Sequence, residues 1–143
     1  KVSISGDMIV AGYPTFSSSP GGGVRFLRRN GALWESYDGV SSILNTEVNP
    51  DRLGSDGLAT FGNYTIIGSA SANYQGVLKG VAYLYQTPTP VGSGFWYFVR
   101  KIADPLGQFN FQAGYSAAVS DSYAIVGAPV SNGSKGKVLF LKL

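Results

Sequence analysis

Residues Tyr115–Pro129 read YSAAVSDSYAIVGAP, and this stretch decides the fold. A short strand of small residues comes first, followed by a polar turn at Ser120-Asp121-Ser122 and a second, more apolar strand. Gly127-Ala128-Pro129 closes that second strand. Alternating apolar and β-branched residues favour strands, and a Ser/Asp cluster between two such runs favours a tight turn. The stretch therefore predicts a β-hairpin.

The same pattern occurs twice more, as KVSISGDMIVAGYP in Lys1–Pro14 and as DGLATFGNYTIIGSA in Asp56–Ala70. Three kinds of marker residue recur at spacings of 56 to 62 residues, which indicates a repeat protein. These markers are the glycines that end each second strand, the glycines that open each third strand, and two tryptophans: Gly12, Gly68 and Gly127; Gly23, Gly80 and Gly136; Trp34 and Trp96. We expect the first set to need a close backbone approach or an unusual φ, so that valine at Gly127 would be severely destabilising.

Each full repeat offers four short strands, and the last repeat offers three. The predicted strands are Val2–Ser5, Met8–Gly12, Val24–Arg29 and Leu33–Tyr37; Leu58–Phe61, Tyr64–Gly68, Val81–Gln86 and Phe95–Ile102; Ala117–Ser120, Tyr123–Gly127 and Val138–Leu143. The predicted hairpin turns are Gly6-Asp7, Gly62-Asn63 and Asp121-Ser122.

Four antiparallel strands per repeat are typical of a β-propeller blade. We therefore expect an all-β chain of about three blades, with repeats at residues 1–54, 55–113 and 114–143 and an incomplete last blade. A three-blade arc does not close into a ring, and its outer sheet faces are apolar. We expect Val138–Leu143 to pair with a strand from outside this segment, so that the isolated chain is not a stable monomer and a dimer is the simplest self-contained assembly.

The motif around Ala113-Gly114-Tyr115-Ser116 and Gly127-Ala128-Pro129 resembles the FG-GAP repeat, with Ala113 in place of the family's Phe. Ala11-Gly12-Tyr13-Pro14 is a near match, and Ile67-Gly68-Ser69-Ala70 is a degraded one. FG-GAP repeats form the seven-bladed propeller of integrin α subunits and of many surface proteins. The resemblance implies a propeller that presents ligand-binding loops, at an extracellular or cell-surface location. It implies no enzymatic activity.

Several integrin repeats carry a calcium loop rich in Asp and Asn after the Gly-Ala-Pro strand. The corresponding stretches here are Thr15–Gly22, Ser71–Lys79 and Val130–Lys135, and none contains Asp or Glu. Calcium needs about six to eight oxygen ligands, several of them from carboxylates. The sequence therefore predicts no metal site, and nothing in it indicates a cofactor.

Composition fits a turn-rich β protein, with 20 glycines and only 13% charged residues. No apolar run is long enough to span a membrane, and the first residues do not resemble a signal peptide, so we expect neither. The absence of cysteine is compatible with either redox compartment. Two sequons, Asn63-Tyr64-Thr65 and Asn132-Gly133-Ser134, are candidate N-glycosylation sites in predicted turns.

Catalysis is not expected, because the chain has no His and no Cys and its eight acidic residues form no repeating pair. The +3 net charge is not gathered into one basic stripe, so nucleic-acid binding is not expected either. In the aromatic run Phe95–Phe98, Trp96 and Tyr97 either pack between blades or form a platform for a glycan or protein ligand.

The leading functional hypothesis is a non-catalytic recognition or adhesion module that binds protein or glycan through its loops. One alternative is a structural subunit that self-associates or completes a larger propeller with further blades of its own precursor. A further alternative is an accessory propeller of a carbohydrate-active enzyme.

Overall fold

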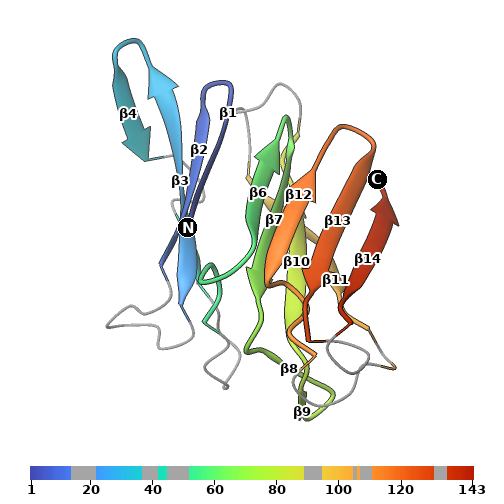
Figure 1. The fold of residues 1–143 in the computed structure, drawn as a ribbon. Coiled ribbons are helices and arrows are strands. Elements are labelled where there is room, and N and C mark those ends of the chain that lie inside the picture. Colours follow the sequence, from blue (N-terminus) through green and yellow to red (C-terminus); the bar gives the residue numbers. More distant parts are fainter. Residues whose placement is uncertain are drawn as a thin grey trace.

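The computed structural model describes residues 1–13, 22–36, 52–88, 95–104, 106, 111–130 and 135–143, and the backbone alone for 42–44 (Figure 1). Every regular element among these residues is a β-strand, so the all-β prediction is confirmed. No described helix has the length and apolar character needed to cross a lipid bilayer.

Three antiparallel sheets follow one another along the chain. Sheet 1 contains β1 (Val2–Ser5), β2 (Met8–Tyr13), β3 (Gly23–Asn30) and β4 (Leu33–Ser36) in that order, with β5 (Ser42–Leu44) also paired to β3. Sheet 2 contains β6 (Leu58–Phe61), β7 (Tyr64–Ser69), β10 (Val81–Gln86) and β11 (Tyr97–Ile102). Sheet 3 contains β12 (Ser116–Val119), β13 (Tyr123–Ala128) and β14 (Lys137–Lys142). The short strands β8 (Asn73–Tyr74) and β9 (Val77–Leu78) pair with each other and form a small antiparallel ribbon.

The predicted hairpins form where the sequence placed them. Their closing pairs are Ser5↔Met8, Phe61↔Tyr64 and Val119↔Ala124. Predicted and observed strand limits differ by one or two residues, a difference normal for strand ends, and β5, β8 and β9 were not predicted. The predicted strand Val138–Leu143 is observed as β14 (Lys137–Lys142), which pairs with β13, and its pairing with a strand from outside the segment stays a prediction.

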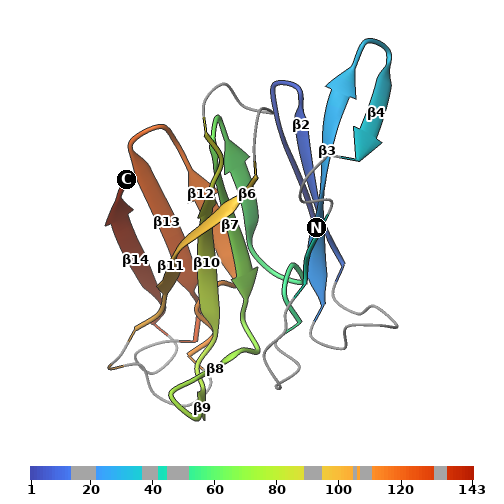
Figure 2. The ribbon, with the colours of Figure 1, turned by 180° about the vertical axis from the view of Figure 1, so that it is seen from behind.

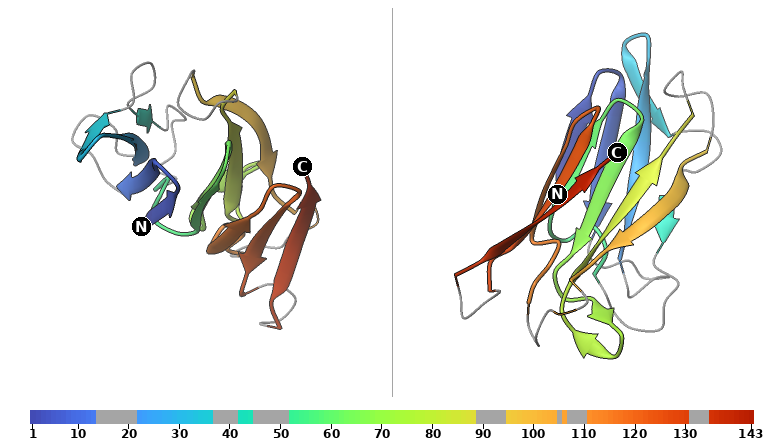
Figure 3. Two further views of the ribbon diagram at one scale, coloured as in Figure 1. Left: turned by 90° about the horizontal axis from the view of Figure 1, so that it is seen from above. Right: turned by 90° about the vertical axis from the view of Figure 1, so that its right-hand side faces the viewer.

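The sheets stand side by side in chain order (Figures 1 and 2). Their first strands β1, β6 and β12 lie next to one another, and from above the sheets spread apart from that side (Figure 3). Hydroxyl groups join the first two of these strands: Ser3 Oγ accepts the Thr60 N–H at 2.9 Å, and Ser5 Oγ accepts the Gly62 N–H at 3.1 Å.

The core consists of the two layers between successive sheets. We call the side of a sheet that is turned to the next sheet its forward face, and the opposite side its rear face. The forward face of sheet 1 carries Met8, Val10, Val24 and Phe26, each at most 1% exposed, and packs on the rear face of sheet 2 through Ile67, Val81 and Tyr83. The forward face of sheet 2 carries Ile66, Ala82 and Leu84, and packs on the rear face of sheet 3 through Ala124, Val126, Leu139 and Leu141.

Glycines allow backbone contact between successive sheets. A Cβ on Gly12 would lie 2.9 Å from the carbonyl carbon of Gly54, and a Cβ on Gly68 would lie 2.9 Å from that of Gly114. Gly54 and Gly114 have φ angles of +80° and +91°, a region that favours glycine. Parallel bridges at Gly22↔Leu53 and Gly80↔Ala113 complete the two contacts.

Gly127 differs from its two counterparts. A Cβ at this position would meet the Ser116 hydroxyl, and the next atoms are at 3.6 Å and beyond. Since a hydroxyl can rotate away, the expected close backbone approach at Gly127 is wrong for this chain. The approach at Gly12 and Gly68 comes in each case from the segment that leads into the next sheet, at Gly54 and Gly114, and the described residues contain no sheet after that of Gly127.

Candidate functional site

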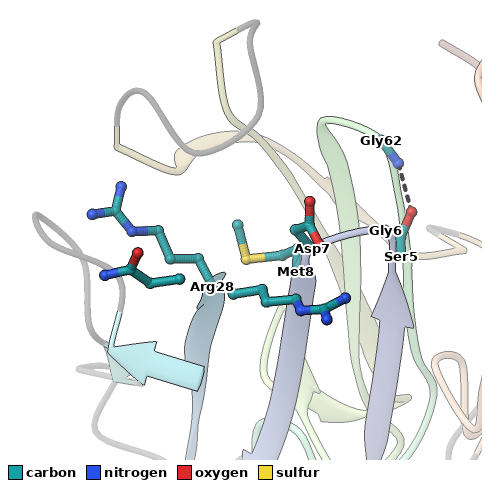
Figure 4. A pocket seen from close by; sticks show the side chains of 8 residues that line it. Ser5, Gly6, Asp7, Met8, Arg28 and Gly62 are labelled. Carbon is teal, nitrogen blue, oxygen red and sulfur yellow. Dashed lines mark hydrogen bonds between the residues drawn. The ribbon is translucent and has the colours of Figure 1, made fainter. Parts of the chain in front are cut away.

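A pocket of about 570 Å³ opens where the hairpin turns of sheets 1 and 2 meet. It is lined by Ser5, Gly6, Asp7, Met8, Arg28, Arg29, Asn30 and Gly62. Figure 4 shows Asp7 and Met8 between Arg28 on one side and Ser5 with Gly62 on the other. The pocket therefore draws on the β1–β2 turn, the end of β3 and the β6–β7 turn.

Strand register holds these residues together. Met8 is paired with Arg28, and the Arg29 N–H donates to the Asp7 carbonyl at 2.9 Å, which extends the ladder into the turn. Gly6 adopts a φ of +54°, which lets the chain reverse within two residues. The Ser5–Gly62 hydrogen bond then fixes this turn to the neighbouring turn of sheet 2.

Two guanidinium groups give the pocket its chemical character. The Arg29 Nε donates to the Gly31 carbonyl at 3.0 Å, which fixes this side chain at the turn between β3 and β4. Asn30 Nδ2 donates to Glu35 Oε2 at 3.0 Å, so Glu35 is engaged by an amide. Arginine presents planar sets of N–H donors that match carboxylate and similar anionic groups. The pocket can therefore bind an anionic or strongly polar group.

The same pocket offers little for catalysis or metal binding. Asp7 is the one carboxylate among its lining residues. In the part of the chain that the structure describes, no three His, Cys, Asp or Glu side chains are grouped in a way that could hold a metal ion.

Trp96 lies in the core and does not form the surface platform considered from the sequence. It is 5% exposed, and its ring stacks on Phe26 at 4.7 Å between centroids and 19° between planes. The residue directly precedes β11 of sheet 2 and is covered by Phe26 of sheet 1, so its packing role is the one that the structure supports. A ligand cannot reach its ring in this conformation.

Tyr97 is exposed, and exposed aromatic residues flank it. Phe95, Tyr97 and Phe98 are 51%, 55% and 55% exposed, and Phe98 meets Tyr85 edge-on at 5.8 Å. Phe95 precedes β11, and the register places Tyr97 opposite Gln86 and Phe98 opposite Tyr85, on opposite faces of sheet 2. None of the three lines the turn-end pocket. Tyr97 therefore remains a candidate contact residue, separate from that pocket.

Of the two sequon asparagines, the structure describes Asn63 but not Asn132. Asn63 lies in the β6–β7 turn, half-buried and next to the pocket residue Gly62, and its carbonyl accepts the Thr87 N–H at 2.9 Å. Asn132 lies outside the described residues. Glycosylation at either site stays a prediction.

A charged contact joins sheets 2 and 3. Asp104 follows β11, is 7% exposed, accepts the Leu106 N–H at 3.0 Å and forms an ion pair with Lys137 of β14. The hydrogen bond from Lys137 lowers the pKa of Asp104 below its ordinary value, and the Leu106 N–H and the positive charge of Lys137 act in the same direction, while burial opposes them. The contact serves the packing of β14.

Sequence reasoning identified Asp7 and Gly62 as turn residues but missed the pocket. The sequence shows no single basic stripe, and nothing in it singles out Arg28, Arg29 or Asn30. The usable signal was that Gly6-Asp7 and Gly62-Asn63 occupy the same turn in successive repeats, and successive repeats are neighbours in space.

Comparison of the chain with protein-family models and with curated proteins found no match.

Proposed function

We propose that the chain is part of a β-propeller that acts as a non-catalytic recognition module and binds its ligand at the turn end of sheets 1 and 2. The observation that carries this proposal is the pocket that Arg28, Arg29 and Asp7 share with Gly62 of the next sheet. A site assembled from the turns of two successive sheets fits the way in which repeat proteins present ligand-binding surfaces.

The propeller architecture is supported by three features of the fold. Successive antiparallel sheets pack face to face, their first strands are adjacent, and the same glycine contact recurs at Gly12 and Gly68. The FG-GAP assignment is supported by the location of the motif, since Gly68 of one repeat meets Gly114 of the next. An extracellular or cell-surface location belongs to the same proposal and rests on that resemblance.

The ligand group that the pocket fits is an anion carried by a protein or a glycan, such as a carboxylate or a sulfate. Arg28 beside the β1–β2 turn and Arg29 at the β3–β4 turn provide charge and directional donors, and Asp7 adds an acceptor for a hydroxyl or amide of the ligand. A pocket of this size admits one sugar residue or one or two amino-acid side chains, which indicates that further affinity would come from surrounding loops.

The test is binding of the 143-residue chain to an array that holds acidic glycans, neutral glycans and acidic peptides. We expect binding to acidic members of one class, and at least a tenfold loss of affinity in Arg29→Gln, because a charge-assisted hydrogen bond contributes about 1.5–3 kcal/mol. Arg100→Gln is the matched control, since Arg100 is an exposed arginine on β11 outside the pocket. Equal losses in both variants, or no binding to any acidic member, would contradict the proposal.

The alternative of a structural subunit is favoured by one specific observation, the exposed apolar face of sheet 3, on which the next subsection depends. The described residues offer no observation that favours an accessory role beside a carbohydrate-active enzyme.

A further inference from the structure

The forward face of sheet 3 carries apolar residues at the positions that are buried on the forward faces of sheets 1 and 2. Strand register relates each position in one sheet to a position in the next: Gly12, Gly68 and Gly127 pair with Val24, Ala82 and Val138. Counting from these pairs, Val10 corresponds to Ile66 and Ile125, and Phe26 corresponds to Leu84 and Phe140.

The corresponding positions are apolar in all three sheets and differ in exposure. Val10, Ile66, Phe26 and Leu84 are at most 1% exposed, because the next sheet covers them. On sheet 3, Ile125 is 39% exposed, Val138 64% and Phe140 67%, and Tyr123 packs on Phe140 at 5.1 Å between ring centroids. Contiguous exposed apolar surface of this kind marks an interaction site.

The rear face of sheet 1 is apolar on β1 and also carries the exposed arginines Arg25 and Arg29 of β3. Val2 and Ile4 are 70% and 61% exposed, and their alternation with Ser3 and Ser5, which bond to sheet 2, places them on the rear side. Val2 pairs with Ala11 of β2, and the same register position is held by Leu58 in sheet 2 and by Ala117 in sheet 3. Ile4 pairs with Ile9, and its position is held by Thr60 in sheet 2 and by Val119 in sheet 3. Leu58, Ala117 and Val119 already pack against a forward face inside this chain.

We propose that the forward face of sheet 3, defined by Tyr123, Ile125, Val138 and Phe140, binds the rear face of sheet 1 of a second copy of this chain. Such a contact continues the interface that sheets 1 and 2, and sheets 2 and 3, already form, with the same register positions on each side. Each chain carries both halves, so the contact is head-to-tail. A head-to-tail contact closes into a ring or extends into a filament, and two copies would give about six sheets, within the usual range of about four to eight for a closed propeller.

The first measurement is the mass of the 143-residue chain in native buffer by sedimentation at micromolar concentration. We expect a species of at least twice the 15.1 kDa of one chain. Phe140→Glu and Ile4→Glu should each reduce the mass to that of one chain, because either change places a carboxylate in an apolar interface. Leu106→Glu is the matched control, because Leu106 is 88% exposed and belongs to neither face, and it should associate like the original chain.

The decisive measurement is a mixture of the two single variants. Phe140→Glu retains an intact rear face and Ile4→Glu an intact forward face, so the head-to-tail contact predicts a one-to-one heterodimer when two monomeric variants are combined. An association of two forward faces predicts that Ile4→Glu stays a dimer by itself and that the mixture gives no heterodimer, and either result would overturn the proposal.

A monomeric original chain would also overturn it, and would leave the face to a further repeat of the same polypeptide. Circular dichroism and urea unfolding of each variant identify loss of fold. If Phe140→Glu or Ile4→Glu does not fold, Val138→Glu and Val2→Glu make the same test at neighbouring exposed positions.

Discussion

Gly68→Ala should destabilise the protein strongly and Gly127→Ala hardly at all, although the two glycines hold the same position in successive repeats. A Cβ at Gly68 would lie 2.8 Å from the Gly57 carbonyl oxygen and 2.9 Å from the Gly114 carbonyl carbon, and closer still to the Gly114 oxygen. Ordinary contact for such atoms is about 3.5 Å or more. The backbone of the second or the third repeat must therefore move.

The cost of that movement can be estimated from the contacts it disturbs. The Gly68 N–H donates to Gly57 O at 2.5 Å, and the Gly57 N–H donates to Gly114 O at 2.7 Å, so a shift strains two buried hydrogen bonds. Overpacking costs about 1–3 kcal/mol and each weakened hydrogen bond about 0.5–1.5 kcal/mol. Gly68→Ala should therefore lower the free energy of unfolding by about 2–6 kcal/mol.

Gly127→Ala provides the matched control. The added methyl group meets only the Ser116 hydroxyl, which can rotate, and alanine reduces the entropy of the unfolded chain by about 0.4–1 kcal/mol. We expect no loss of stability beyond about 0.5 kcal/mol. The assay is urea unfolding followed by circular dichroism, with equal m-values required for the comparison. Similar losses in the two variants, or a loss below about 1 kcal/mol in Gly68→Ala, would refute the reasoning.

Three further predictions concern the charged contact, the core and the absence of metal. Asp104→Asn should destabilise the protein by about 1 kcal/mol at neutral pH, a modest value because Lys137 is half-exposed. The folded-state pKa of Asp104 is lowered, so this contribution to stability is present above about pH 4 and is lost as the pH falls through the folded-state pKa. The urea midpoints of the variant and the original chain should therefore converge in acid. Phe26→Ala should cost about 3–5 kcal/mol in urea unfolding, because Phe26 is fully buried against Trp96, and a smaller loss would place that ring outside the core. Adding a chelator should leave the thermal unfolding midpoint unchanged, and a drop would reveal a bound cation that the acid-free loops do not suggest.

Most of the strands could be predicted because they depend on local patterns. Alternating apolar residues define the hairpins, and Gly6 and Gly62 supply the positive φ that their turns need. The β8–β9 ribbon was missed for a local reason. Its turn places Gln75 and Gly76 at φ angles of +54° and +77°, a conformation for which Asn-Gly or Asp-Gly is the usual signal.

The two tryptophans show where local patterns stop being informative. Trp34 and Trp96 mark comparable places in their repeats, yet Trp34 is 39% exposed and Trp96 is 5% exposed. Trp96 is buried because Phe26 of the preceding sheet covers it, whereas Trp34 belongs to the first sheet of the described chain. Burial at such positions depends on which sheet lies alongside, and alternation within one strand carries no such information.

The turn-end pocket was missed for the same reason. Asp7 and Gly62 are separated in sequence by a full repeat, and they meet only because sheets 1 and 2 are side by side. The expected backbone contact at Gly127 was wrong because that contact is made by the next repeat and not by the glycine's own sheet. In each case the usable signal was the repeat spacing, because residues that lie one repeat apart in the sequence become neighbours in adjacent sheets.

The central claim is that successive sheets pack face to face, and nuclear Overhauser contacts across the two layers test it most directly. With assigned side-chain resonances, we predict cross-peaks between the Phe26 and Trp96 rings across the first layer and between Leu84 and Val126 methyl groups across the second. Cross-peaks confined to strand pairs within each sheet, in a folded chain with these resonances assigned, would contradict the packing from which both the pocket and the docking face are derived.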